Sequence, residues 1–93
     1  MVKLVGNDIY RGGEKIGWLQ TPHIFAHDGK KLGYFEGIFV YNADARKIAY
    51  LEGNFLVPEG GGPKVPVQKI VEDVTGGVIP DIERAAIFVL LGN

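Results

Sequence analysis

Apolar and polar residues alternate along most of the chain, in short runs that end at turns rich in glycine, aspartate or asparagine. The clearest pattern is a lysine followed by Ile or Leu, a small residue and an aromatic residue. It occurs at intervals of sixteen residues, within 14–20, 30–36 and 46–52, and a weaker copy occurs at 68–72. A fixed period in a short chain indicates one structural unit that was copied and stacked.

Each copy has the form of the second strand of a β-hairpin, because an apolar run and a turn precede it. Asp28-Gly29 is a strong signal for a tight hairpin turn. The pattern predicts hairpins over residues 8–20, 23–36, 38–52 and 54–72. The repeated lysines are Lys15, Lys31, Lys47 and Lys69. Their spacing indicates that the fourth hairpin has a loop about six residues longer than the others, over residues 58–66.

The faces of these strands follow from their alternation. Ile16 and Trp18 are expected on one face of a regular strand, and Gly17 and Leu19 on the other. Both faces are largely apolar, so the hairpins must pack on each other and on a further element.

The small residue of the repeat, at Gly17, Gly33 and Ala49, indicates that backbone or a bulky side chain comes close to it. Four crowded copies predict a closed arrangement with few free sheet edges. We therefore expect one domain over residues 1–93, mainly β, with four β-hairpin repeats around a pseudo-four-fold axis and a C-terminal helix.

The end of the chain changes its period. Apolar residues with helical spacing are Ile82, Ala85, Ala86, Val89 and Leu90. Pro80 suits the first turn of a helix, so a helix is predicted over residues 80–91, where it would plug the open face of the hairpins. The alternative is a buried strand over residues 86–91.

Composition excludes several classes of function. The chain has 93 residues, a net charge of −1 and no cysteine. Without a basic excess, a nucleic-acid partner is not expected. Without cysteine there is no disulfide, thiolate nucleophile or zinc–thiolate site. No apolar run reaches transmembrane length, so we expect a cytoplasmic bacterial protein with no membrane partner and no cofactor.

The hairpin Ile-Phe-Ala-His-Asp-Gly-Lys-Lys-Leu-Gly-Tyr, the long fourth loop and the final Arg-Ala-Ala-Ile-x-x-Leu-Leu-Gly segment resemble the 4-fold beta flower family of small bacterial proteins. The resemblance covers residues 7–92. The hairpin is also similar to tyrosine-aspartate repeats and, more distantly, to MORN repeats, which occur in long arrays. The resemblance implies a fold, but no activity is assigned to the family, so it implies no catalytic residue.

Few residues are candidates for chemistry. His23 and His27 lie about 13 Å apart if they share one strand, which is too far for a common metal ion, so no metal site is expected. His27 alone could act as a general base. Trp18, Tyr34 and Tyr50 are expected on one face, either as packing residues or as a stacking platform for an aromatic, sugar or peptide ligand.

The sequence thus favours a non-enzymatic binding or protein-interaction module. The alternative is a small-molecule-binding protein or minor enzyme, with a pocket framed by Trp18, Tyr34, Tyr50 and the 58–66 loop. The apolar circumference of the C-terminal segment, including Phe88, also predicts a homodimer or a protein partner. Its interface is expected on the uncovered side of the helix or on the second face of the hairpins.

Overall fold

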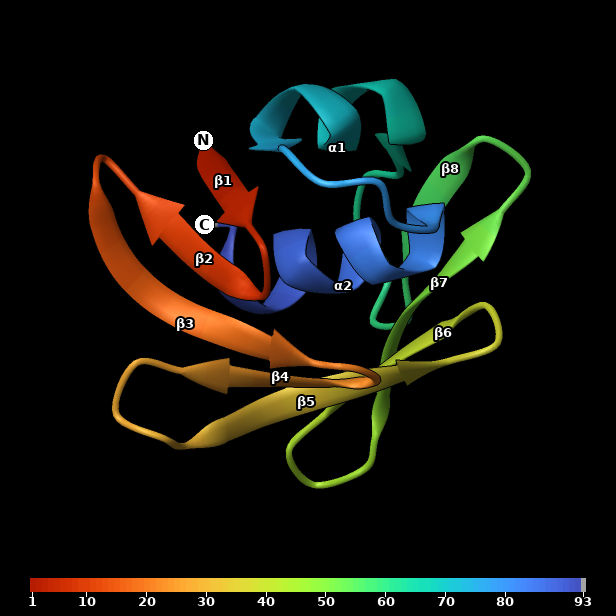
Figure 1. The fold of residues 1–93 in the computed structure, drawn as a ribbon. Coiled ribbons are helices and arrows are strands. Elements are labelled where there is room, and N and C mark those ends of the chain that lie inside the picture. Colours follow the sequence, from red (N-terminus) through yellow and green to blue (C-terminus); the bar gives the residue numbers. More distant parts are fainter. Residues whose placement is uncertain (93) are drawn as a thin grey trace.

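The computed structural model describes residues 1–92, and it is mainly β with a C-terminal helix, as expected (Figure 1). Its elements are β1 (Val2–Val5), β2 (Asp8–Arg11), β3 (Glu14–Gln20), β4 (His23–Ala26), β5 (Lys31–Glu36), β6 (Phe39–Asn42), β7 (Lys47–Glu52), β8 (Phe55–Pro58), β9 (Val65–Pro66), α1 (Val67–Asp73), β10 (Val74–Thr75) and α2 (Asp81–Leu91). The strands of the described residues form one sheet in the order β10-β1-β2-β3-β4-β5-β6-β7-β8-β9. Neighbours are antiparallel except β1 and β10, which are parallel.

The sheet curls around α2, so that this helix lies inside it (Figure 1). The two edge strands, β9 and β10, have two residues each and belong to one continuous segment, in which α1 connects them. α1 also packs against α2. The β9–α1–β10 segment therefore joins the two edges of the sheet, and little edge is left to pair with other chains.

Three β-bulges at equivalent positions bend the sheet. The pairing skips one residue in each of the pairs β2–β3, β4–β5 and β6–β7, which leaves Ile16, Leu32 and Ile48 without a direct partner. A bulge bends its strand and increases the local twist. It also shifts the alternation by one position, so the repeated lysine and the aromatic residue three positions later share the outer face.

The bulge corrects one expectation about the faces. Gly17 and Leu19 share one face, as predicted, and this face is the buried inner one. Ile16 and Ile48 were expected to share the face of the aromatic residues, but both pack against the core. They can do so because a bulged residue is released from the regular alternation of the strand.

The crowding predicted at the small position is confirmed, and the close neighbours are partly residues of α2. A Cβ atom added to Gly17 would lie 2.9 Å from Cδ1 of Leu91, and one added to Gly33 would lie 2.9 Å from Cδ1 of Leu90. Each would also collide with a carbonyl group of the next strand. The small residues therefore let the sheet approach the helix closely.

The fourth hairpin differs from its prediction. Leu56 pairs with Val65, which places Val65 sixteen residues after Ala49, in the same register as Gly17 and Gly33. The period of sixteen thus continues, and Leu56 and Val65 are as far apart in the chain as the equivalent pairs Ile24–Gly33 and Val40–Ala49. The predicted second strand over residues 67–71 is wrong, because these residues lie in α1.

The same correction applies to the repeated lysine. Lys69 is not the fourth copy, since it lies in α1 and pairs with Asp73 at 3.3 Å, one helical turn away. The register position of the repeated lysine is Pro63, and the next residue, Lys64, lies beside the sheet with Nζ 6.0 Å from the ring centroid of Phe55.

One position of the hairpin turns has the same left-handed φ in all four hairpins. Gly13, Gly29 and Gly61 have positive φ, and the equivalent residue of the third hairpin, Ala45, has a φ of 64°. The backbone N–H groups of Gly29, Ala45 and Gly61 each donate to the carbonyl three residues earlier. A Cβ atom makes the left-handed conformation unfavourable, so the third hairpin holds its alanine under strain.

Ala45→Gly is therefore expected to stabilise the protein by about 0.5–1 kcal/mol. The relief of backbone strain should outweigh the entropy that a glycine adds to the unfolded chain. The midpoint of urea unfolding should rise. The same substitution at Ala43, the exposed neighbour two positions earlier, supplies the control and should give no increase. An unchanged or lower midpoint for Ala45→Gly would show that the turn is not strained.

The C-terminal helix is confirmed, and the alternative strand over residues 86–91 is wrong. α2 begins directly after Pro80. It is buried from Glu83 to Ile87, and Ile87 is 0% exposed. The curled sheet and α1 enclose more of this helix than one flat sheet could. Its apolar circumference therefore does not by itself require a partner.

Candidate functional site

The three aromatic residues singled out in the sequence stand half-buried on the outer face of the sheet, on alternate strands. Trp18 lies on β3, Tyr34 on β5 and Tyr50 on β7, and the strands between them contribute further rings. We name this surface the aromatic–lysine face; its residues are Trp18, Phe25, Tyr34, Phe39, Tyr41 and Tyr50, with Lys15, Lys31 and Lys47.

Two pairs of these rings stack across neighbouring strands. Trp18 and Phe25 have ring centroids 5.3 Å apart and an interplanar angle of 9°, and Tyr34 and Tyr41 have 4.7 Å and 8°. These separations are close to the distance of about 4.8 Å between strands, so the rings stand upright on the sheet and turn their faces toward each other. One face of each of these four rings is therefore covered by its partner.

The lysines of the repeat cover further parts of the rings. Nζ of Lys15 lies 5.5 Å from the Trp18 ring centroid, Nζ of Lys31 lies 5.1 Å from that of Tyr34, and Nζ of Lys47 lies 4.0 Å from that of Phe39. Such cation–π contacts stabilise exposed pairs by about 0.5–1 kcal/mol each. At Trp18 and Tyr34, the flat faces that a sugar or planar ligand would stack on are thus occupied by the protein itself.

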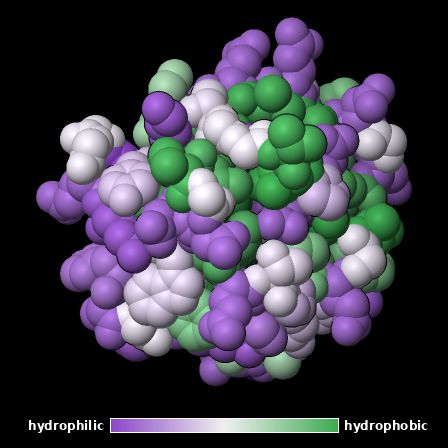
Figure 2. Space-filling model, viewed as in Figure 1, coloured by the Kyte–Doolittle hydropathy of each residue, from purple (hydrophilic) through white to green (hydrophobic). Residues whose placement is uncertain are grey.

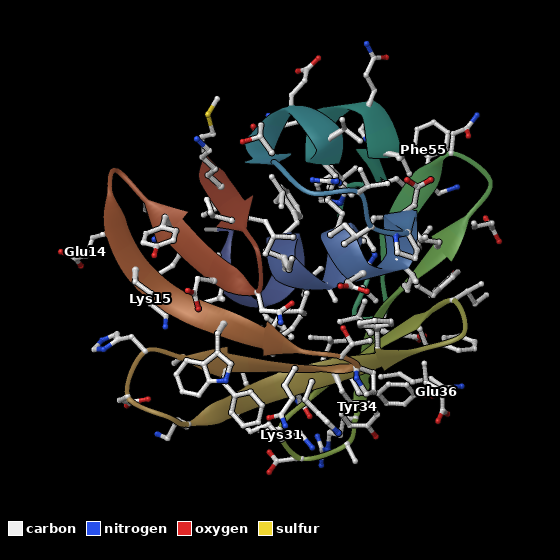
Figure 3. All side chains as sticks on the ribbon, in the orientation of Figure 1. Glu14, Lys15, Lys31, Tyr34, Glu36 and Phe55 are labelled. Carbon is white, nitrogen blue, oxygen red and sulfur yellow. The ribbon has the colours of Figure 1, made fainter. Side chains whose placement is uncertain are left out.

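The lysines differ in their acidic partners. Lys15 pairs with Asp8 at 3.0 Å, and Lys64, at the other end of the row, lies 3.9 Å from Glu52. Within residues 1–92, Lys31 and Lys47 form no such ion pair. Figure 3 shows Lys31, Tyr34 and Glu36 along the lower side of the molecule. The middle of the face therefore offers two cations free to meet carboxylates of another molecule.

The structure does not place the predicted histidine with the rings. His27 is exposed in the turn between β4 and β5. His23 is the histidine that contacts the face, with its ring centroid 5.8 Å from that of Tyr34 in an edge-on arrangement. Its Nδ1 atom is buried and has no hydrogen-bond partner among the described residues. The pairing of His23 with Tyr34 in a hairpin register could have indicated this neighbour.

A buried charged pair at the start of α2 was not anticipated. The guanidinium group of Arg84 donates to the carbonyl oxygens of Val74 at 2.8 Å, Gly76 at 2.8 Å and Gly77 at 3.1 Å. Glu83 is 6% exposed, and burial raises its pKa above the ordinary value of 4.5. Arg84 has a structural role, since it fastens the 74–77 segment to α2 from the inside.

Two opposing effects limit the shift at Glu83. The hydroxyl of Thr21 donates to Oε2 of Glu83 at 3.5 Å, and the positive charge of Arg84 is close; both lower the pKa of this carboxyl group. Burial of the carboxyl group outweighs both of them, so the pKa of Glu83 stays raised.

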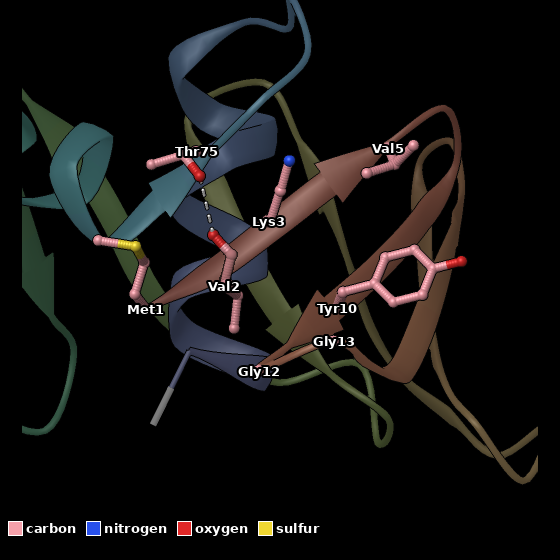
Figure 4. A pocket seen from close by; sticks show the side chains of 8 residues that line it. All are labelled: Met1, Val2, Lys3, Val5, Tyr10, Gly12, Gly13 and Thr75. Carbon is pink, nitrogen blue, oxygen red and sulfur yellow. Dashed lines mark hydrogen bonds between the residues drawn. The ribbon is translucent and has the colours of Figure 1, made fainter.

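A shallow cavity of about 530 Å³ lies across β1 and β2, lined in part by Lys3, Val5 and Tyr10, away from the predicted pocket at Trp18, Tyr34 and Tyr50 (Figure 4). No three His, Asp or Glu residues among the described ones are grouped to hold a metal ion. Neither helix in the described range has the length and apolar character needed to span a membrane.

A hydrophobic patch forms the second notable surface. Figure 2 shows strongly hydrophobic residues gathered over α1 and the chain beside it, whereas the surface over β3–β5 is mostly polar or intermediate. Val71 is 47% exposed and Val78 is fully exposed. Charged residues of α1 border this patch: Lys69 and Glu72 are exposed, and Lys69 pairs with Asp73 at 3.3 Å.

No family model, no curated protein and no solved structure matches the chain. The resemblance to the 4-fold beta flower proteins therefore stays a prediction that depends on the hairpin motif. A function has to be inferred from the geometry of the aromatic–lysine face.

Proposed function

We propose that this protein is a non-enzymatic protein-interaction module that binds its partner through the aromatic–lysine face. One observation carries the proposal: the stacked rings of Tyr34 and Tyr41 lie half-buried beside Lys31 and Lys47, which form no ion pair within residues 1–92. Aromatic side chains are enriched in protein interfaces because one rigid group offers apolar area and, in tyrosine, a hydroxyl that can hydrogen-bond.

The alternative is a small-molecule-binding protein or minor enzyme with a pocket framed by Trp18, Tyr34, Tyr50 and the 58–66 loop. Stacking ligands need open ring faces. At Trp18 and Tyr34 these faces are covered by Phe25 and Tyr41 and by lysines. The geometry therefore favours a protein partner over a stacked ligand.

We also infer that the hairpins β2–β3, β4–β5, β6–β7 and β8–β9 are four copies of one unit around a pseudo-four-fold axis. The sixteen-residue register supports this arrangement, and so do recurring backbone hydrogen bonds. Leu19, Phe35, Leu51 and Val67 donate in turn to the carbonyl groups of Asn7, Pro22, Ile38 and Asn54. Copied hairpins would repeat the same lysine and aromatic group side by side, and so build one extended binding face from a short motif.

Site-specific photo-crosslinking tests the binding face. A benzophenone amino acid in place of Tyr34 should give a covalent adduct with another protein chain in cells of the source organism. The same amino acid at Gln68, exposed on α1 beside the hydrophobic patch, should give none. Mass spectrometry identifies the adduct. Adducts only from Gln68, or from neither position, would contradict the proposal.

A further inference from the structure

The aromatic–lysine face has a direction, set by the charges at the two ends of its strands. β5 begins at Lys31 and ends at Glu36, and β7 begins at Lys47 and ends at Glu52. β5 and β7 run the same way, because each is antiparallel to β6 between them. Both lysines therefore lie at one end of the face and both glutamates at the other.

Neighbouring charges do not cancel this order. The turn before β5 carries Asp28 and Lys30, and the turn before β7 carries Asp44 and Arg46, so each turn adds one charge of each sign. Glu59 follows β8 and donates its backbone N–H to the carbonyl of Ile48, so it adds one negative charge beside Lys47 and reduces the positive charge of this end without cancelling it. Glu36 forms no ion pair within the described residues, and Glu52 has only the 3.9 Å contact with Lys64. A positive end and a negative end remain, separated by roughly 16 Å along the strand.

A surface with this order is complementary to its own copy. In a face-to-face dimer, a two-fold axis that lies in the interface and crosses the strands reverses their direction but keeps their order. Such an axis at the level of Tyr34 and Tyr50 places each lysine end against the glutamate end of the other copy.

The same two-fold axis places aromatic side chains at the centre of the interface. Tyr34, Tyr41 and Tyr50 lie between the charged ends, so half-buried rings would meet half-buried rings and the charges would surround them. An apolar, aromatic centre with a charged rim is the usual anatomy of a specific interface. An isologous contact of this kind closes on itself and does not continue into a filament.

We infer that the partner at the aromatic–lysine face is a second copy of this chain, docked antiparallel, an inference that rests on the proposed function. Lys31 then faces Glu36 of the partner subunit, and Lys47 faces Glu52 of the partner subunit. The outer face is convex because the sheet curls around α2 (Figure 1). A convex face buries a small area, so the dimer is weak, reversible and weakened by salt.

Charge reversal in two complementary variants tests this arrangement. Light scattering from about 10 µM to about 1 mM should show wild-type dimers, which dissociate as the salt concentration rises from about 0.05 M to about 0.5 M. The variant K31E/K47E and the variant E36K/E52K should each dimerise at least about tenfold more weakly. An equimolar mixture of the two should recover the wild-type mass, because every charged pair is restored with its sign exchanged.

The control is K3E/K69E. It changes the net charge by the same amount as K31E/K47E, but on β1 and α1, away from the aromatic–lysine face, and it should dimerise as the wild type does. Circular dichroism confirms that all variants are folded. A monomeric wild type, or variants that dimerise normally, would overturn the inference. A mixture that stays monomeric would overturn the antiparallel docking. If the wild type is monomeric but Tyr34 still crosslinks to a different protein, the interaction module stands and self-association does not.

Discussion

Gly33→Val is expected to lower the free energy of unfolding by roughly 3 kcal/mol. Its Cβ atom would collide with the carbonyl group of Tyr41 and lie 2.9 Å from Cδ1 of Leu90. The carbonyl belongs to the next strand and cannot move without breaking the ladder, and the Leu90 side chain is confined within the curled sheet. Strand and helix must therefore separate locally, with loss of packing along α2.

The matched control is Gly60→Val in the loop between β8 and β9. A Cβ atom there meets nothing within 4 Å, and Gly60 is not among the glycines with positive φ. Its unfolding midpoint in urea should stay close to that of the wild type. Equal midpoints for the two variants would show that the sheet does not press on α2 at Gly33.

Arg84→Met should also cost roughly 3 kcal/mol, for a different reason. Methionine keeps much of the apolar stem but leaves the carbonyl groups of Val74, Gly76 and Gly77 without their donor. Amide hydrogen exchange should rise first in β10 and in β1, which pairs with it, before the rest of the sheet is affected.

Arg46→Met is the control, since Arg46 is exposed in the turn between β6 and β7 and uses only its backbone N–H as a donor to Asn42. This variant should unfold within about 0.5 kcal/mol of the wild type. If Arg84→Met behaves in the same way, the guanidinium does not fasten β10, and the edge of the sheet is held by backbone pairing alone.

Much of the sheet could be predicted because its information is local. Hairpin register depends on a turn and on two adjacent strands, and residues such as Asp28-Gly29 specify the turn. The helical period of α2 was equally readable. The bulges were less visible, since a bulged Ile16 and a regular strand residue look alike in the sequence. The spacing of three between Lys15 and Trp18 was their only trace.

The fourth hairpin shows where a repeat can mislead. Lys69 fitted the lysine pattern but lies in α1, while the residue that continues the register is Val65, which resembles no earlier copy in type. Only the pairing of Leu56 with Val65 reveals the equivalence. The strand-pairing register is the same at Val65 although the residue types differ from those of the earlier copies. A comparison of residue types therefore could not identify the fourth copy.

Prediction of the candidate site was partial for a similar reason. Trp18, Tyr34 and Tyr50 were recognised from the repeat, but their stacking partners lie on other strands and follow from pairing rather than from spacing. The buried contacts of Arg84 join α2 to the 74–77 segment. No local pattern indicates that an arginine between a glutamate and an alanine points inward.

The helix α2, which covers the inner face of the sheet, is synthesised after all the strands. Most strand pairings join neighbours in the chain, so these hairpins can form as the polypeptide emerges. The inner face of the sheet, however, stays uncovered until α2, at the end of the described chain, has been made. β1 likewise waits for β10, some seventy residues later. Until then the nascent chain exposes an apolar concave surface, the kind of surface on which molecular chaperones act.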